Sequence, residues 1–285
     1  MNCIDFEDVS FTYPAVEGDV DADGKQIVPS PVFSHCNLSL PAGFTSLIGP
    51  NGSGKTTFMM LASGRIAPQT GRCSLFGKDM AALSGEEKNL VASVIYQNME
   101  FENSDKVKNL LSYVYANGAL KGKAGGIRTP SSSLLDETIA VFELERVLSH
   151  GLTQLSKGEI QRVLLAFSLL YGSASVFMDE PLFAMEQSQK ETALAYLRDY
   201  AKTTGTAVFI SMHELDLTRA YAETVLLFHP NRDMDYGTPD EVMTDADLEK
   251  AYGVPASMLK KSEDMTREGL KQASDAILRT SSLSL

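Results

Sequence analysis

The stretch Leu47-Ile48-Gly49-Pro50-Asn51-Gly52-Ser53-Gly54-Lys55-Thr56-Thr57 joins a short apolar run to a glycine-rich turn that ends in Lys-Thr-Thr. It fills every specified position of the pattern G-x-x-x-x-G-K-[ST]. Its three glycines let the backbone come close to a ligand, so that successive N–H groups can converge on phosphate oxygens. A helix beginning near Lys55 would add its positive dipole end, Lys55 a mobile charge and Thr56 a hydroxyl for Mg²⁺. The stretch therefore predicts a strand, a phosphate-binding loop and a helix.

Composition limits the classes of protein that this chain can belong to. It has 285 residues, of which 44% are hydrophobic, enough for one large or two small globular domains. The formal net charge of −12 argues against nucleic acid as a partner held by a general electrostatic field. The three cysteines, Cys3, Cys36 and Cys73, are scattered and favour neither a disulfide framework nor a zinc site, which fits a reducing cytosol.

Nothing in the sequence predicts export or a membrane span. The first ten residues, MNCIDFEDVS, carry acids where a signal peptide has a basic region and an apolar run. The longest uncharged stretch, Val163 to Met178, is too short to span a bilayer and is better explained as a buried helix, a turn at Gly172 and a buried strand. Any membrane association is therefore expected to come through a partner.

The N-terminal part of the chain is predicted to be rich in strands. Ile4 to Tyr13 alternates apolar and polar residues and stops at Pro14, which is typical of a half-buried strand. Between this strand and the next, Asp19 to Gly24 copies the first half of a calcium loop, but Ser30 stands where a bidentate Glu is needed, which favours a solvated hairpin tip. Further strands are expected at Val32–Leu40, Phe44–Ile48, Arg72–Phe76 and Val91–Tyr96, with a helix at Lys55–Ser63 ended by Gly64.

From Asn98 to Tyr171 the pattern becomes helical, interrupted at Gly118 to Ser133 by a segment rich in Gly, Ser and Lys that predicts a flexible loop. Ser133 with Asp136, and Ser156 with Glu159, have the spacing of capping boxes and mark two helix starts.

Buried strands and helices then alternate. Strands are expected at Ala174–Met178 and Thr206–Met212, with a helix at Glu186–Thr203 closed by Gly205 between them. This order predicts an α/β fold with a mostly parallel sheet, whose active residues lie at the carboxyl ends of the strands. Gly49, Asp179 and His213 all occupy such positions. The polar tail, residues 254–285, is expected to contain one helix near Met265 to Leu278.

Asp179 and Glu180 follow a buried strand directly, which suggests a site for phosphoryl transfer. That chemistry needs a phosphate cradle, a magnesium carboxylate and a group that orients water. Asp179 can supply the metal carboxylate, and Glu180 can orient or activate the attacking water. A solvated turn is the simpler explanation of an Asp-Glu pair, but the complete phosphate loop upstream favours the functional one.

Six motifs in one order resemble those of the ATP-binding cassette (ABC) ATPases over nearly everything from Ile4 to Gly253. They are Tyr13, Gly49 to Thr57, Gln97, Leu155 to Glu159 with Ile160-Gln161-Arg162, Val176 to Pro181, and His213. The resemblance implies a P-loop NTPase core of RecA-like type with an N-terminal antiparallel β subdomain. It also implies an inserted α-helical subdomain at about 98–171, within an ATPase domain spanning 1–253.

The resemblance also implies a role for each motif. Tyr13 would stack on adenine, and Gly49, Pro50, Asn51, Gly52, Ser53, Gly54, Lys55, Thr56 and Thr57 would bind the phosphates of ATP. Thr56, Gln97 and Asp179 would surround Mg²⁺, with Glu180, Gln97 and His213 as the catalytic group. Ser156, Lys157, Gly158 and Glu159 would complete the site of a second cassette across a dimer.

The chain departs from the family pattern in two segments. Lys157 stands where the family usually has the first glycine of its signature, which is electrostatically tolerable near a phosphate. Phe183 and Glu186 stand where the loop after the second carboxylate usually has Ser and Asp. Because that loop is thought to connect the two sites of a dimer, the change puts symmetric, fast hydrolysis in question.

The favoured interpretation is the cytoplasmic ATP-hydrolysing subunit of an ABC transporter, more an importer than a fused exporter, because the chain has one cassette and no membrane helix. It would bind ATP and Mg²⁺, pair with a second cassette as a homodimer or heterodimer, and lie on the inner face of the membrane through a permease subunit. Two alternatives stay open: a soluble ABC ATPase, such as a cluster-assembly type, and a weakly hydrolysing regulatory subunit.

Overall fold

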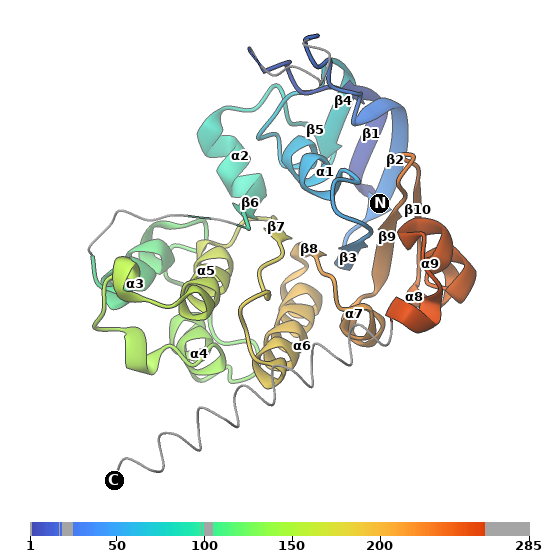
Figure 1. Ribbon diagram of the computed structural model, residues 1–285. Coiled ribbons are helices and arrows are strands. Elements are labelled where there is room, and N and C mark those ends of the chain that lie inside the picture. The colour runs from blue at the N-terminus through green and yellow to red at the C-terminus, as the bar shows by residue number, and fades with distance from the viewer. Residues whose placement is uncertain (1, 17, 19–24, 98, 100–104, 260–285) are drawn as a thin grey trace.

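The computed structural model describes residues 2–16, 18, 25–97, 99 and 105–259. Figure 1 shows an N-terminal sheet, a central sheet and a group of helices to one side. The predicted hairpin tip at 19–24 and the predicted tail helix at 265–278 lie outside the described residues. Within them, no helix is both long enough and apolar enough to cross a bilayer.

The N-terminal sheet is antiparallel. Its strand order is β2-β1-β4-β5, formed by β1 (Asn2–Phe11), β2 (Phe33–Pro41), β4 (Thr70–Leu75) and β5 (Lys78–Asp79). The apolar residues of β1 are buried and most of its polar residues are not, as its alternating pattern predicts. β4 enters the sheet at Gly71, which has φ of +79°, and a Cβ there would lie 2.3 Å from the backbone oxygens of Glu7 and Asp8. Only glycine fits this approach.

The central sheet has six strands among the described residues, in the order β10-β9-β3-β8-β7-β6. The pairs from β9 to β6 are parallel, and only β10 runs antiparallel to its neighbour. Every residue of β3 (Phe44–Ile48), β7 (Ser175–Asp179) and β8 (Ala207–Ser211) is buried, as expected for parallel strands covered on both faces. The outer strands are β6 (Ala92–Ile95), β9 (Thr224–Phe228) and β10 (Met234–Gly237).

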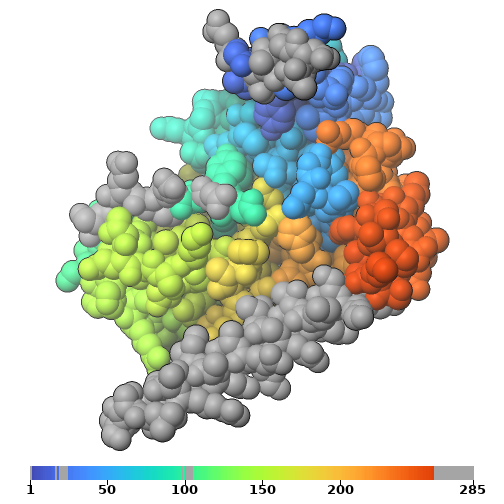
Figure 2. All heavy atoms as spheres, viewed as in Figure 1, coloured from blue at the N-terminus to red at the C-terminus, as the bar shows by residue number. Residues whose placement is uncertain are grey.

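Helices pack around the central sheet in two groups. One group lies to the side of β6 and β7 and consists of α3 (Val107–Asn117), α4 (Leu134–Val141) and α5 (Lys157–Tyr171). The others are α1 (Lys55–Ala62), α2 (Gly85–Val91), α6 (Gln187–Thr204), α7 (Leu215–Tyr221), α8 (Pro239–Val242) and α9 (Asp245–Tyr252). In Figure 2 the green-yellow α3 to α5 region and the orange-red C-terminal elements form opposite sides of the face shown.

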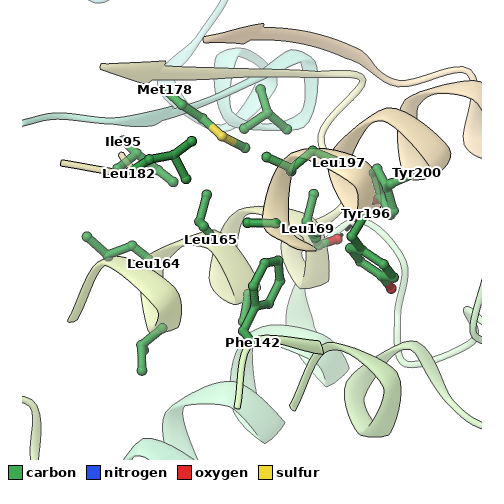
Figure 3. Close-up of a cluster of buried hydrophobic side chains, with 14 of the residues drawn as sticks. Ile95, Phe142, Leu164, Leu165, Leu169, Met178, Leu182, Tyr196, Leu197 and Tyr200 are labelled. Carbon is green, nitrogen blue, oxygen red and sulfur yellow. Dashed lines mark hydrogen bonds between the residues drawn. The ribbon is translucent and has the colours of Figure 1, made fainter. Parts of the chain in front are cut away.

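The main hydrophobic core joins β7 to the helices on one face of the sheet. Leu165 and Leu169 of α5 point toward Leu197 of α6, and Met178 of β7 closes the cluster (Figure 3). Phe142 meets the fully buried ring of Tyr196 edge-on, with ring centres 5.8 Å apart. This continuous packing ties the helical group to the strands that end in the predicted site residues.

Most predicted elements are present, with differences at their ends. The predicted strand at Val91 begins at Ala92, because Val91 ends helix α2, whose Ser84 cap bonds Glu87 N–H at 3.3 Å. The loop 118–133 contains no helix or strand, yet its backbone is held: Ile127, Arg128 and Thr129 donate N–H bonds of 2.8 to 3.1 Å to the buried Glu137 carboxylate. The expected flexibility therefore does not extend to residues 127–129.

Candidate functional site

The phosphate loop leaves the carboxyl end of β3 and wraps into the start of α1. Gly49, Gly52 and Gly54 have φ of +140°, +74° and +111°. At Gly49 a Cβ would lie 2.6 Å from the Phe228 carbonyl oxygen, so a side chain would push the loop off the neighbouring strand β9. The close approach of β9 therefore requires glycine at position 49.

Lys55 is the first residue of α1 and lies folded back on the loop. Its Nζ donates to the carbonyl oxygens of Gly49 at 2.7 Å and Pro50 at 3.0 Å. Burial lowers the pKa of Lys55, and the nearby carboxylates Glu180 and Asp179 partly oppose that shift. The ammonium group is thus held against the loop backbone, in a residue that lines the neighbouring pocket.

The loop forms one wall of an open pocket of about 660 Å³. The opposite walls come from the ends of β6, β7 and β8 and from the segments around Tyr13 and Val32. Its lining consists of Tyr13, Ser30, Val32, Asn51, Gly52, Gly54, Lys55, Thr56, Thr57, Gln97, Asp179, Glu180, Phe183, His213 and Arg232. Most residues that the sequence assigned to one chain's nucleotide site therefore line a single hollow.

Thr56 and Asp179, two of the three predicted magnesium ligands, meet directly. The Thr56 Oγ1 donates to Asp179 Oδ2 at 2.6 Å, and Ser211 Oγ donates to Asp179 Oδ1 at 2.7 Å. A hydroxyl and a carboxylate are hard oxygen donors of the kind that Mg²⁺ prefers. Here the two oxygens already lie within hydrogen-bond distance of each other. The donor set therefore fits a magnesium ion beside the phosphate loop. Ser211 is a supporting residue that the sequence reading missed.

Glu180 is held by two side chains from neighbouring strand ends. Its Oε2 accepts from Gln97 Nε2 at 2.6 Å, and its Oε1 lies 2.6 Å from His213 Nε2. Its backbone has φ of +48°, a conformation that non-glycine residues rarely adopt, and its N–H donates to Ser211 Oγ at 2.8 Å. The three residues predicted to be catalytic thus form one hydrogen-bonded group.

The pair formed by Glu180 and His213 favours its charged form. The hydrogen bond from His213 lowers the pKa of Glu180, and the bond to Glu180 raises the pKa of His213. The raised pKa means that the pair's contribution to stability is complete below the ordinary His pKa and is lost as pH rises through the folded value. At the acid end it is lost as pH falls through the lowered pKa of Glu180.

Replacing Glu180 by glutamine is expected to lower the pKa of His213 toward the ordinary histidine value, because the largest cause of its shift is removed. An NMR titration of the His213 ring in the nucleotide-free protein measures this change. E143Q is the matched control, since Glu143 pairs with Arg162 instead. An unchanged His213 pKa in E180Q would contradict the ion pair.

Tyr13 lies at one end of the pocket with its side chain partly exposed. Its hydroxyl is 3.1 Å from Thr57 Oγ1, and its ring packs edge-on against Phe11 with centres 4.9 Å apart. At 41% exposure the ring is accessible to a planar ligand. The structure therefore places it where a base could stack beyond the phosphate loop.

The segment Ser156 to Glu159 is not part of the lining of this pocket. Ser156 caps helix α5, and the Glu159 carboxylate accepts from Ser156 N–H at 2.8 Å. Those bonds lower the pKa of Glu159. Ser156 and Lys157 are exposed, and none of the four residues lines the pocket of their own chain. The structure confirms the predicted cap and leaves the segment's surface free to face another molecule.

Two side chains near the loop come from elements that the sequence reading did not describe. The Tyr252 hydroxyl of α9 accepts from Gly49 N–H at 3.0 Å, and Arg232, between β9 and β10, donates to the Gly52 carbonyl oxygen. Both lie far from the loop in sequence, and neither belongs to a motif with a recognisable spacing.

Comparison with known proteins identifies the family. Residues 33–183 match the model of the ABC transporter family. The hemin import ATP-binding protein HmuV of Mesorhizobium japonicum is 30% identical over 241 residues, covering 82% of this chain and 88% of the relative. The petrobactin import ATP-binding protein YclP of Bacillus subtilis is 24% identical over 229 residues, covering 80% of this chain and 89% of the relative.

Solved structures show the same fold. An ATP-binding subunit of an ABC transporter superposes with a TM-score of 0.68 at 21% identity, covering 91% of this chain and 98% of that one. A dimeric ATP-binding cassette bound to ADP and Pi gives 0.62 at 21% identity, covering 78% and 93%. With the phosphate loop, the carboxylate pair and the 30% identical relative, these likenesses show that this chain belongs to the ABC transporter family and is one of its ATPase cassettes.

Proposed function

We propose that this chain binds and hydrolyses ATP to energise solute import by a multi-subunit ABC transporter. The observation that carries the proposal is the group in which Gln97 and His213 hold Glu180, next to the pair formed by Thr56 and Asp179. We assign residues 1–253 to the ATPase domain, with a helical subdomain at about 98–171, and residues 254–285 to a C-terminal extension.

In the proposed reaction the loop amides and Lys55 bind the phosphate tail, and stacking of adenine on Tyr13 adds about 1–3 kcal/mol. Thr56 and Asp179, with Gln97 nearby, would hold Mg²⁺, which supplies charge neutralisation on the outer phosphates. Glu180 orients the attacking water and accepts its proton, while His213 and Gln97 keep the carboxylate in position. These roles need the Glu180 side chain to exchange one of its present partners for water.

A second cassette would complete the site. The exposed Ser156 to Glu159 segment begins helix α5, whose positive end can meet an anion on another molecule. Because this segment lies outside its own chain's pocket, we propose that it faces the phosphate tail bound by a partner cassette. Phe183, whose side chain is 73% exposed at the pocket rim, would then lie in the contact between the two.

Import is proposed from the relatives, which are named for hemin and for petrobactin import. A separate permease subunit would carry the solute, and the cassette would lie on the cytoplasmic face of the membrane through that subunit. The two relatives are named for the import of different solutes. We therefore propose that the partner subunits, and not the cassette, select the solute.

A groove beside Gln97 is the surface that we propose for the permease. It has a volume of about 320 Å³ and lies between β6, α3 and α5. Ile95, Met99, Val114, Leu164 and Phe167 line it with apolar side chains. An amphipathic helix fits such a groove, and Gln97, two residues before Met99, connects it to the nucleotide site. Phe101, the other anchor expected from sequence, lies outside the described residues.

Replacing Met99 by aspartate is expected to leave Mg-ATP binding by the isolated subunit within about twofold while abolishing its recovery with membranes, because a charge would be buried against apolar groups. Co-purification of a tagged subunit with the membrane fraction measures this loss. M258D is the matched control, since Met258 is 61% exposed and lies outside the groove.

The same purification tests the proposed function. Recovery of an integral membrane permease with the parent chain, together with ATP hydrolysis by that complex, supports the transport role. Recovery of a stable complex that contains only soluble proteins would contradict the transport role. Equal recovery of M99D and the parent with the permease would show that the contact surface lies elsewhere.

A further inference from the structure

Arg232 occupies the tight turn between β9 and β10. The turn is closed by His229 N–H donating to the Asp233 carbonyl oxygen at 2.9 Å and by Arg232 N–H donating to the His229 carbonyl oxygen at 3.1 Å. β9 lies next to β3 in the sheet, so this turn comes beside the phosphate loop that follows β3 (Figure 1). The fold thus brings a cation from the C-terminal part of the chain to the nucleotide pocket.

The backbone of Arg232 is in the left-handed region, with φ of +75°. Glycine and asparagine adopt this conformation far more readily than arginine does. Side chains on both sides help to hold the turn, since Asn231 Nδ2 donates to Asp233 Oδ2 at 2.6 Å. An unfavourable backbone conformation that is held by its surroundings often occurs at a functional position.

The side chain of Arg232 reaches the phosphate loop itself. Its Nη1 donates to the Gly52 carbonyl oxygen, and the residue lines the pocket together with Asn51 and Lys55. A guanidinium has five N–H donors in a planar fork, so this bond leaves donors for a further acceptor. The Gly52 contact fixes the guanidinium at the rim of the loop before any ligand arrives.

The acidic surroundings of the pocket give the positive charge of Arg232 an electrostatic role. Asp179 and Glu180 line the same hollow, and the whole chain has a formal net charge of −12. Lys55 already bonds two loop carbonyls, and His213 is held by Glu180. A second permanent cation therefore offsets the repulsion that the polyanionic tail of a nucleotide meets in an acidic protein.

We propose that Arg232 is a further nucleotide-binding residue, whose guanidinium contacts the phosphate tail of ATP while it stays bonded to the phosphate loop. The inference rests on the proposed ATP site and adds to it a residue outside the six motifs. It also explains why a long cation stands in a turn position that suits glycine.

The test compares Mg-ATP and Mg-ADP affinities of full-length R232G and R232N with those of the parent by isothermal titration calorimetry. Both replacements suit the left-handed turn but remove the guanidinium. Affinity for both nucleotides is expected to fall about tenfold, the low end for a charge-assisted hydrogen bond at a partly solvated site. The thermal midpoint of unfolding is expected to stay equal or to rise, because the backbone strain is relieved.

K250Q is the charge-matched control, because Lys250 of α9 lies outside the pocket and its loss removes one positive charge. Its affinity for Mg-ATP is expected to match the parent within about twofold, as suits an exposed charge that does not line the pocket. Unchanged affinity in R232G and R232N, or an equal loss in K250Q, would overturn the assignment. A parent chain that binds no Mg-ATP would instead overturn the ATP site itself, and the inference with it.

Discussion

The variant Glu180→Gln is expected to bind Mg-ATP with nearly parental affinity while its steady-state turnover falls by about 10²–10⁴-fold. Glutamine keeps the size of the side chain and can still bond Gln97, but it cannot accept a proton from water. Because Glu180 is proposed to act in the chemical step and not in phosphate binding, the loss should appear in kcat.

Phosphate release under saturating Mg-ATP, combined with a calorimetric binding titration, separates these two quantities. E143Q serves again as the control with the same chemical change outside the pocket, and its turnover should equal that of the parent. Hydrolysis by E180Q at the parental rate would show that another group orients the water.

The variant Lys55→Ala is expected to lose nucleotide affinity itself, by about a hundredfold or more, since a charge-assisted hydrogen bond contributes about 1.5–3 kcal/mol and this one lies in a partly desolvated loop. The buried Nζ bridges two loop carbonyls, so its removal also loosens the loop that presents the backbone amides.

Fluorescence or calorimetric titration with Mg-ATP measures the loss. K202A is the matched control, because Lys202 lies exposed in the last turn of α6, far from the loop in the chain. A circular dichroism spectrum should show that K55A is folded. Parental affinity in a folded K55A would contradict the phosphate-binding role of the loop.

Local patterns predicted most of the residues that line the pocket. The strand Phe44–Ile48 has the same bounds in the structure, and the predicted helix after the phosphate loop starts at Lys55 as expected. Asp179 ends its strand beside the loop because parallel strands share one carboxyl edge. These features depend on contiguous residues or on the rules of parallel sheets, which explains why sequence could find them.

Features that depend on distant contacts were not predicted. Glu137 holds residues 127–129 and also accepts from the Tyr196 hydroxyl, so the order of that loop depends on a helix that lies 59 residues further along the chain. Arg232 reaches Gly52 across 180 residues from a turn without any motif. Helix α2 was missed although Ser84 and Glu87 have the spacing of a capping box.

The most direct test of the central claim is the mass of E180Q in solution with and without Mg-ATP. Ser156 and Gly158 do not line their own chain's pocket, and we propose that they reach a nucleotide across an interface between two cassettes. Light scattering coupled to size exclusion is expected to show a monomer without nucleotide and a dimer of twice that mass at saturating Mg-ATP. A strictly monomeric E180Q that nevertheless binds Mg-ATP would contradict the two-cassette account.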